Sequence, residues 1–213
     1  VRFTTSHPKD MTDDLIECFN SCSKLAPFLH LPVQSGSNKI LKSMNRKHNI
    51  EFYYSIIEKL KKINSNIDFS SDFIIGYPNE NDEDFELTMK MVRKVQFTNS
   101  YSFIFSPRPG TPASISQEVN HKIAKKRLKI IQAKLFDTQI NSNKNLERKE
   151  LEVLVENKLK NQNNYFGRTK KMTPVIFESN RCKPGDLIHV TINSSNQNNL
   201  FGEHKKSSKF NAA

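Results

Sequence analysis

The run Ile67-Asp68-Phe69-Ser70-Ser71-Asp72-Phe73-Ile74-Ile75-Gly76 decides the fold of the first part of this chain. Its apolar residues predict a strand suited to burial on both faces, as is typical of a parallel sheet. The segment Asn81-Asp82-Glu83-Asp84 follows shortly after, and its acidic side chains suit the positive N-terminal end of a helix. A buried strand that leads into a helix is the repeating unit of an α/β fold.

The same alternation extends in both directions from this run. Apolar runs predict further strands at residues 1–5, 28–33 and 101–105, and helical spacing of apolar residues predicts helices at 37–44, 49–63 and 82–95. Strands that alternate with helices imply a parallel sheet with right-handed crossovers. Four such strands suit part of a barrel or an open sheet, and are too few for a closed eight-stranded barrel.

The pattern changes in the last third of the chain. Residues 116–146 read as one long basic helix, with Leu128, Ile131 and Leu135 as its apolar side. Short alternating strands are then expected near 150–156, 164–169, 175–178, 187–192 and 200–202, separated by turn residues. About five such strands predict a small all-β barrel of the OB-like type. We therefore expect an α/β domain over 1–146, a β-domain over 147–206 and a disordered tail over 207–213.

The charge and the cysteines narrow the class of protein. The net charge is +11, and the last 67 residues carry +5 of it. This surplus suits a polyanionic partner such as nucleic acid, although a lysine-rich solvated surface explains it about as well. The three cysteines argue against a disulfide framework and for a reducing compartment, the cytoplasm. Cys18 and Cys22 lie in a helical pattern, so we interpret them as ordinary helix residues rather than cluster ligands.

No apolar stretch is long enough for a membrane helix, and no signal peptide is visible, so no membrane partner is expected. The first residue is Val1, which lies inside a predicted strand. We therefore expect the chain to be a piece of something longer.

Polar clusters follow each of the four predicted strands. The clusters are Thr4-Thr5-Ser6-His7-Pro8, Gln34-Ser35-Gly36-Ser37, Asp72 with Gly76–Glu80, and Ser106–Thr111. Parallel strands of an α/β fold deliver their C-terminal ends to one pole, where ligands bind. Any one of these clusters is most simply interpreted as a helix cap or a turn. Four clusters that each follow a strand at the same end of the sheet favour a binding site.

Three residues in or beside these clusters have competing interpretations. A carboxylate at Asp72 interrupts a buried run, and such a group is costly unless it is hydrogen-bonded. His30 has a similar setting, and a satisfied core histidine is the simpler interpretation. Arg108 stands between two prolines, where it suits either a carboxylate or phosphate clamp or a surface position in a proline-rich turn.

Four longer stretches, in this order, resemble the methylthiotransferase family of radical S-adenosylmethionine enzymes. They are Arg2-Phe3-Thr4-Thr5-Ser6-His7-Pro8, His30-Leu31-Pro32-Val33-Gln34-Ser35-Gly36-Ser37, Ser71-Asp72-Phe73-Ile74-Ile75-Gly76-Tyr77-Pro78 and Ser100-Tyr101-Ser102-Phe103-Ile104-Phe105-Ser106-Pro107-Arg108-Pro109-Gly110-Thr111-Pro112-Ala113. Their variants are most similar to the branch that acts on dimethylallyladenosine in tRNA. Phe166-Gly167-Arg168-Thr169 and Leu200-Phe201-Gly202 resemble the TRAM domain of the family. Asn79 stands where members commonly have glycine, and asparagine tolerates the same left-handed backbone.

The resemblance implies a fold and a reaction. The fold is the C-terminal half of a radical S-adenosylmethionine partial (β/α) barrel, followed by the OB-like TRAM domain. The reaction adds a methylthio group to carbon 2 of the dimethylallyladenosine beside the tRNA anticodon. It uses S-adenosylmethionine and two [4Fe-4S] clusters, whose ligands lie upstream of Val1, so this chain alone is not expected to catalyse it. The implied partners are the tRNA anticodon stem-loop, the preceding N-terminal part of the same protein and an external reductant.

The resemblance and the shared pole also suggest contacts. Gln34, Ser35 and Asp72, with Thr5, Ser6 and Arg108 as weaker candidates, are expected to hold S-adenosylmethionine. The β-domain is expected to contact RNA phosphates through Arg168, Lys170, Lys171, Arg181 and Lys183, with Tyr165 or Phe166 as a stacking surface and the other in the core. Two other interpretations stay open: a non-catalytic RNA-binding adaptor, and a methylthiotransferase for threonylcarbamoyladenosine or a ribosomal protein.

Overall fold

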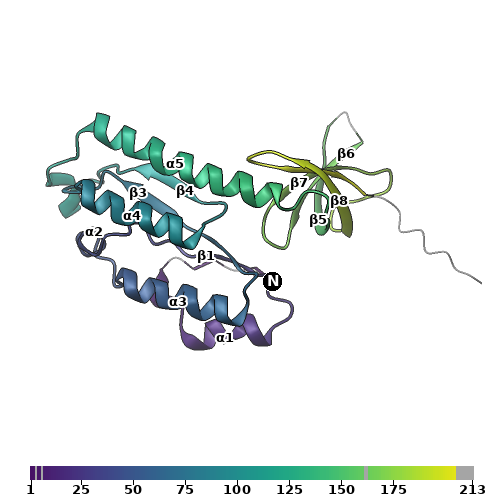
Figure 1. Ribbon diagram of the computed structural model, residues 1–213, viewed down its shortest axis with the longest axis horizontal. Helices are drawn as coiled ribbons and strands as arrows, with labels where there is room; N and C mark the ends of the chain where they lie inside the picture. The colour runs from purple at the N-terminus through teal and green to yellow at the C-terminus, as the bar shows by residue number, and fades with distance from the viewer. Residues whose placement is uncertain (3, 6, 161–162, 205–213) are drawn as a thin grey trace, which may run out of the picture. The chain divides into compact units, whose positions relative to one another are not determined.

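The computed structural model describes residues 1–2, 4–5, 7–160 and 163–204, so the predicted tail at 207–213 lies outside the described residues. The chain divides into two compact units, Val1–Thr138 and a second unit that begins at Gln139. Figure 1 shows helices and parallel strands in the first unit and a small barrel in the second. Among the described helices, none is both long and apolar enough to cross a membrane.

The first unit contains four short strands and most of the helical residues. The strands are β1 (Phe28–His30), β2 (Asp68–Ser70), β3 (Asp72–Ile75) and β4 (Tyr101–Ile104). The helices are α1 (Asp13–Ser21), α2 (Asn38–Ser43), α3 (Ile50–Ile63), α4 (Asp82–Val95) and α5 (His121–Lys144), with 3-10 turns at Pro8–Asp10 and Pro112–Ile115. The helices predicted at 37–44, 49–63 and 82–95 are thus confirmed, whereas the long basic helix begins five residues later than expected.

The strands are parallel, and their order in space follows their order in the chain. β1 pairs with β2 and β3 pairs with β4, while a bridge from Gln34 to Phe73 continues the first pair into the second. A bridge from Thr4 to His30 adds the N-terminal segment at the other edge. The Val1 carbonyl also accepts from the Ala26 N–H at 2.9 Å, but no full strand is assigned among the described residues of this segment. Sequential winding of this kind is that of a barrel, rather than of an open sheet with a switch point.

The strand predicted over 67–76 is split at Ser71. The Ser71 backbone N–H donates to the Ser100 hydroxyl at 2.9 Å, and the Ser71 hydroxyl accepts from the Val33 backbone N–H at 2.9 Å. At Ser71, hydrogen bonds to side-chain hydroxyls therefore replace backbone-to-backbone hydrogen bonds of the sheet. The predicted strand is for this reason divided into β2 and β3.

The helices all pack on one face of these strands. The buried core combines Leu29, Leu31, Phe69, Phe73 and Ile75 of the strands with apolar residues of α1, α3, α4 and α5. Tyr53, Ile56 and Leu60 of α3 lie in this core, as their spacing predicts, and so do Ile131 and Leu135 of α5. The opposite face of the strands is left without a helical layer among the described residues (Figure 1).

The second unit is a closed barrel of five strands, in the order β5-β6-β7-β9-β8. Its strands are β5 (Glu150–Lys158), β6 (Asn164–Thr169), β7 (Pro174–Glu178), β8 (Leu187–Ser195) and β9 (Leu200–Glu203), which confirms the five predicted strands. All pairings are antiparallel except that of β7 with β9. Val153, Val155, Tyr165, Phe177 and Val190 are among the side chains that fill the interior. A five-stranded closed barrel of this type is consistent with the OB-like fold.

Candidate functional site

The candidate site lies on the face of the strands that carries no helices. In β3, Phe73 and Ile75 are buried toward the helices, while Asp72 and Ile74 are only half-buried on the other face. The register pairs Asp72 with Tyr101 and Ile74 with Phe103, so these four side chains share that face. Tyr101 and Phe103 are 61% and 56% exposed, which is unusual for aromatic residues within a sheet. This face is therefore accessible and carries both a carboxylate and aromatic rings.

A polar pocket of about 480 Å³ opens on this face. It is lined by Thr4, Thr5, His30, Pro32, Gln34, Arg46 and Asp72. The structure thus brings together three of the predicted ligand contacts: Thr5, Gln34 and Asp72. His30 is hydrogen-bonded, as a core histidine would be, but it lines the pocket and is only half-buried. Ser6 lies outside the described residues.

Gln34 reaches this pocket because of its backbone. Its φ of 74° lies in the left-handed region, which non-glycine residues rarely adopt. Two hydrogen bonds hold it there: the Gln34 N–H donates to the Asp72 carbonyl at 3.0 Å, and the Ile74 N–H donates to the Gln34 carbonyl at 3.0 Å. Such a conformation, maintained by its neighbours, is typical of binding sites.

A second, larger pocket of about 850 Å³ shares Gln34 and Arg46 with the first. Its other lining residues are Ser43, Met44, Asn45, Ile74, Tyr77, Phe103, Ile104, Phe105, Ser106, Arg108, Thr111, Pro112 and Ala113. Arg108 therefore lines a different pocket from Asp72 and Thr5. The combination of aromatic rings with guanidinium groups suits a ligand that is part aromatic and part anionic.

Arg46 lines both pockets, and the sequence analysis missed it. The left-handed Asn45, with a φ of 55°, ends α2 in a Schellman arrangement, in which the Arg46 N–H donates to the Leu41 carbonyl at 2.9 Å. The guanidinium donates to the Pro32 carbonyl at 3.0 Å, and its buried Nε has no hydrogen-bond partner among the described residues. The asparagine after a short helix was the available signal, but it does not indicate where the next side chain points.

The electrostatics around Arg46 are dominated by burial. Burial lowers the pKa of Arg46, and the nearby Asp72 carboxylate opposes that shift. Burial, helped by the positive charge of Arg46, lowers the pKa of His48 to about 4 and also lowers that of His7. The rings of His7 and His48 meet edge to face, with centroids 5.0 Å apart. Both rings are therefore neutral near pH 7, and Arg46 is the positive charge between the two pockets.

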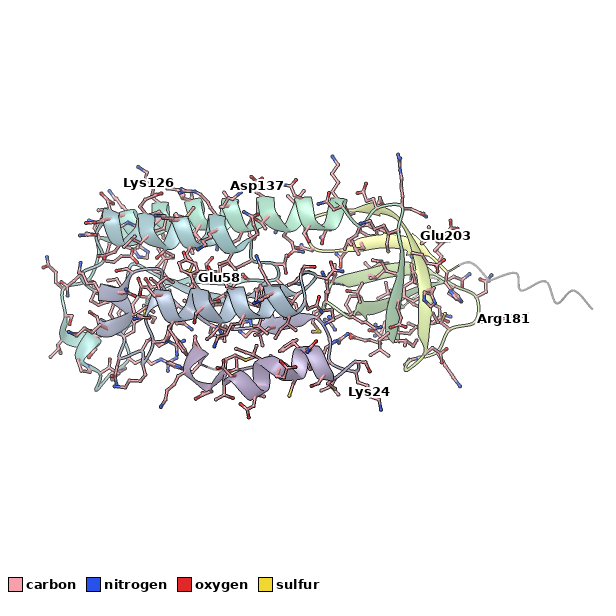
Figure 2. All side chains as sticks on the ribbon, turned by 60° about the horizontal axis from the view of Figure 1, so that its bottom comes forward. Lys24, Glu58, Lys126, Asp137, Arg181 and Glu203 are labelled. Carbon is pink, nitrogen blue, oxygen red and sulfur yellow. The ribbon has the colours of Figure 1, made fainter. Side chains whose placement is uncertain are left out.

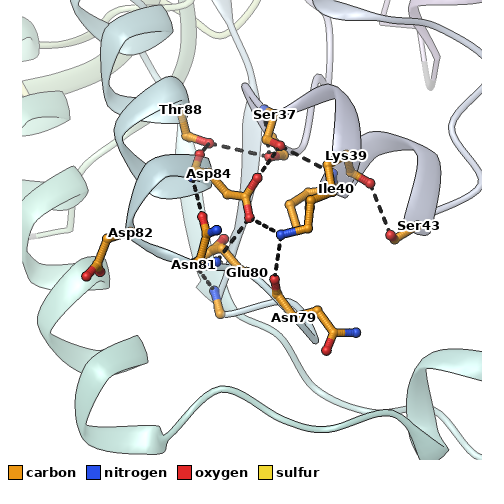
Figure 3. Close-up of polar contacts among 12 residues, drawn as sticks. Ser37, Lys39, Ile40, Ser43, Asn79, Glu80, Asn81, Asp82, Asp84 and Thr88 are labelled. Carbon is orange, nitrogen blue, oxygen red and sulfur yellow. Dashed lines mark hydrogen bonds and ion pairs between the residues drawn. The ribbon is translucent and has the colours of Figure 1, made fainter.

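Ser35 does not reach either pocket. It is 1% exposed, its hydroxyl lies 3.4 Å from the Thr88 hydroxyl, and it accepts from the Ser37 N–H at 3.2 Å. Within the Gln34–Ser37 segment, Gln34 therefore lines the pocket, whereas Ser35 and Ser37 contact residues of α4. Figure 3 shows the polar cluster around the start of α4.

Asp84 is the centre of this cluster. Its carboxylate accepts from the Ser37 hydroxyl and the Lys39 ammonium, both at 2.7 Å, and from the Asn81 N–H at 3.0 Å (Figure 3). Burial alone would raise the pKa of Asp84, but these hydrogen bonds outweigh it and lower the pKa. Asn81 and Asp84 complete a reciprocal capping box. This cluster attaches the loop after Gln34 to α4, and is structural rather than part of the pockets.

The loop between β3 and α4 is held by a buried ion pair. Gly76 and Asn79 adopt left-handed φ values of 71° and 64°, which confirms that asparagine serves in the turn. The Glu80 carboxylate accepts from the Gly76 N–H at 3.1 Å and from Arg127 of α5 at 2.8 Å. This arrangement fixes Tyr77, a lining residue of the larger pocket.

In the barrel, the five predicted RNA contacts differ in their surroundings. Arg168 forms an ion pair with Glu156 and lies over the Phe166 ring, 5.0 Å from its centroid, and Lys170 pairs with Glu152 at 2.9 Å. Lys171 is half-buried. Arg181 and Lys183 are exposed in the loop between β7 and β8, and no ion pair to either is found within the described chain (Figure 2 labels Arg181). Tyr165 is buried in the core and Phe166 is half-buried outside it, as strand alternation predicts for neighbours.

The described residues do not supply a site for an iron–sulfur cluster. Cys18 and Cys22 are exposed on α1 and at its end, and Cys182 belongs to the other unit. Across the described ranges, no three His, Cys, Asp or Glu side chains gather where they could hold a metal ion. The two pockets together, in contrast, suit a nucleoside-like ligand, because the polar pocket offers a carboxylate, an amide, hydroxyls and a guanidinium, and the larger pocket offers aromatic rings.

Comparisons with known proteins agree with these two units. Residues 1–92 match the model of the Radical SAM superfamily, and residues 144–205 match that of the TRAM domain. The chain is 61% identical over 98% of its length to a protein of Pelagibacter ubique named tRNA-2-methylthio-N(6)-dimethylallyladenosine synthase. A protein of the same name from Rickettsia akari is 46% identical over 95% of the chain. The chain spans about half the length of these relatives, 47% and 46% respectively.

A solved structure resembles this chain in fold. Coproporphyrinogen III oxidase from Escherichia coli, a radical SAM enzyme, superposes with a TM-score of 0.55 at 13% identity, over 80% of this chain and 46% of that one. At this identity the likeness concerns the fold alone. Residues 1–92 thus resemble the Radical SAM superfamily and residues 144–205 resemble the TRAM domain, and these two matched regions lie in the two different units.

Proposed function

We propose that the protein containing this chain is a tRNA methylthiotransferase, which adds a methylthio group to carbon 2 of dimethylallyladenosine beside the anticodon. The observation that carries the proposal is the 61% identity over 98% of the chain to a relative named for this product. The matched region covers 98% of the chain and therefore includes residues of both units. The competing interpretations are a non-catalytic RNA-binding adaptor and a methylthiotransferase for another substrate. The names of the relatives support neither of these two.

In this proposal the first unit contributes part of the S-adenosylmethionine site. Bound S-adenosylmethionine, with [4Fe-4S] clusters held elsewhere in the protein, supplies the radical chemistry and the methyl group. Asp72 and Gln34 offer hydrogen-bond acceptors to the ligand, Thr5 offers a hydroxyl, and Arg46 offers a positive charge to its carboxylate. Arg108 lines the adjoining pocket, where it suits an RNA phosphate. Ser35 has a different role, because its hydroxyl contacts the Thr88 hydroxyl and accepts from the Ser37 N–H, and it thereby stabilises the loop.

The second unit contributes the tRNA contacts, and the anticodon stem-loop is the proposed target. The remaining proposed partners are the N-terminal part of the protein, which would hold two [4Fe-4S] clusters, and an external reductant. A tRNA substrate places the proposed activity in the cytoplasm. The resemblance of residues 1–92 to the Radical SAM superfamily and of residues 144–205 to the TRAM domain supports these proposals.

Replacing Asp72 by alanine in the full-length protein should weaken S-adenosylmethionine binding about 10- to 100-fold, because a charge-assisted hydrogen bond contributes roughly 1.5–3 kcal/mol. Isothermal titration of the ligand measures this change. Asp137→Ala is the matched control, since Asp137 is an exposed residue of α5 that lines neither pocket. An unchanged affinity in a folded Asp72→Ala protein would remove Asp72 from the site.

The two kinds of basic residue on the barrel should differ in their effect on tRNA binding. Changing Arg181 and Lys183 together to glutamine should lower the slope of log affinity against log salt by about 0.9 for each lost contact to a duplex phosphate. Lys170→Gln should change the slope less, because Glu152 already neutralises Lys170. Titrating tRNA against the chain at several salt concentrations measures both slopes. Equal changes in the two proteins would contradict this assignment of the contacts.

A further inference from the structure

His30 lies between two polar neighbours that determine where its hydrogens are. Its Nδ1 is 2.8 Å from the Ser70 hydroxyl, and its Nε2 is 3.5 Å from Asp72 Oδ2. The Ser70 hydroxyl donates its hydrogen to the Asn99 carbonyl at 2.7 Å. Because a hydroxyl has one hydrogen, Ser70 can only accept from His30. Nδ1 of His30 therefore carries a hydrogen, and a neutral ring leaves Nε2 bare beside the carboxylate.

Two states of the pair follow from this geometry. When the ring gains a second proton, on Nε2, the imidazolium and the Asp72 carboxylate form an ion pair without net charge. When Nε2 is bare, two acceptors face the pocket and the pair carries a net negative charge. The His30 and Asp72 side chains are 21% and 31% exposed, so both states are open to a ligand in the polar pocket.

The other groups around the pair do not change charge near neutral pH. Arg46 faces Asp72 and stays positive, although burial lowers its pKa. His48 has a pKa of about 4 and the pKa of His7 is also lowered by burial, with Lys9 and Asp10 as further charges around His7. The remaining polar lining residues, Thr4, Thr5 and Gln34, carry no charge. Among the described residues that line this pocket, His30 supplies the one imidazole, and its Nε2 lies 3.5 Å from Asp72 Oδ2.

We propose that His30 is a positioning residue, held by Ser70, that sets the charge and orientation of Asp72, so that binding of a cationic ligand releases a proton from the His30–Asp72 pair. This inference rests on the proposed function, in which the ligand is S-adenosylmethionine, a sulfonium cation. A cationic ligand binds most favourably when the His30–Asp72 pair carries its net negative charge. Binding of the cation therefore opposes protonation of His30 Nε2. Asp72 touches the ligand, whereas His30 acts through Asp72.

The hydrogen positions are tested first, without any ligand. Nitrogen NMR of the chain with labelled histidine, at a pH where the ring is neutral, reports which ring nitrogen carries hydrogen. We expect the hydrogen on Nδ1 in the native chain and a shift toward Nε2 in Ser70→Ala, because that variant removes the acceptor for Nδ1. A native ring with its hydrogen on Nε2, or a ring unaffected by Ser70→Ala, would overturn the arrangement.

The coupling is tested by calorimetry on the full-length, cluster-loaded protein. S-adenosylmethionine is titrated near pH 6 in two buffers of different ionisation enthalpy, and the difference between the enthalpies gives the protons released. We expect a release approaching about one proton per ligand. His30→Gln, which keeps a donor toward Asp72 but cannot ionise, should abolish the release and make the affinity independent of pH. His189→Gln, on the exposed surface of the barrel, is the matched control.

The outcomes separate this inference from the proposed function. Binding with the same proton release in the native and His30→Gln proteins would overturn the coupling and leave the S-adenosylmethionine site standing. An absence of binding in the native protein would overturn both the proposed ligand and the coupling. The NMR result decides the Ser70–His30 arrangement in either case.

Discussion

Replacing Arg127 by leucine should lower the free energy of unfolding by about 3–5 kcal/mol, the usual cost of removing one partner of a buried ion pair. The Arg127 and Glu80 side chains are 7% and 1% exposed, and the variant leaves the Glu80 carboxylate in the interior without its cation. Urea unfolding of the chain, followed by circular dichroism, measures the loss. The Arg127 contact to Asp82 adds little, because the Asp82 side chain is fully exposed.

The loss should depend on pH in a defined direction. Burial raises the pKa of Glu80, against the opposing effects of the Gly76 hydrogen bond and of Arg127. A raised pKa means that the folded state favours the protonated carboxyl, so this contribution is present at low pH and is lost as the pH rises through the folded-state pKa. Arg127→Leu should therefore be most damaging near neutral pH and less so in acid. In the double variant Arg127→Leu/Glu80→Gln, the pH dependence of this stability loss should disappear. If Arg127→Leu alone lowered the free energy of unfolding equally at all pH values, the explanation would be contradicted.

Replacing Gly202 by alanine should destabilise the barrel by about 3 kcal/mol, the upper range for overpacking, and prevent normal closure. A Cβ at Gly202 would run into the Thr191 carbonyl oxygen of β8 and lie 2.8 Å from Val190 Cγ1. Neither neighbour can move freely, because one is backbone and the other is in the barrel core. Thermal unfolding of the chain, monitored through the barrel residues by NMR, measures the effect.

Gly185→Ala separates a steric clash from backbone strain in the same domain. Gly185 has a φ of 96°, but no described atom lies within 4 Å of the position of its Cβ. Alanine there costs only the unfavourable backbone conformation, about 1–2 kcal/mol. If Gly185→Ala proved as damaging as Gly202→Ala, contacts at β9 would not explain the requirement for glycine at Gly202.

The fold was predictable where local pattern and tertiary structure agree. The apolar spacing of residues 49–63 predicts α3 closely, and the alternation in the last third predicts all five strands of the barrel. The break at Ser71 was not predictable, because it depends on hydroxyl contacts to residues about 30 and 38 positions away. The side of each strand that the helices cover likewise depends on how all the elements pack together.

Of the predicted ligand contacts, the structure brings Asp72 and Gln34 to one pocket and leaves Ser35 outside it. A polar residue in a buried strand needs a reason, and at Asp72 the reason is the pocket. The sequence does not reveal that Gln34 adopts a left-handed backbone, which directs it to the pocket, while Ser35 is buried against Thr88 of α4. Arg46 escaped notice because its position depends on the way α2 ends. The ion pairs of Arg168 and Lys170 depend on the register of β5 against β6, which no local pattern reveals.

The most direct test of the proposed function is a nucleoside analysis of tRNA by mass spectrometry. A strain that lacks its own methylthiotransferase for dimethylallyladenosine would express the full-length gene that contains this chain, either native or with Asp72→Ala. The proposed function predicts that 2-methylthio-dimethylallyladenosine returns with the native gene, and that it is reduced at least several-fold with the variant. Unmodified dimethylallyladenosine in cells that accumulate the native, folded and cluster-loaded protein would contradict the proposal and favour an RNA-binding adaptor or a different substrate.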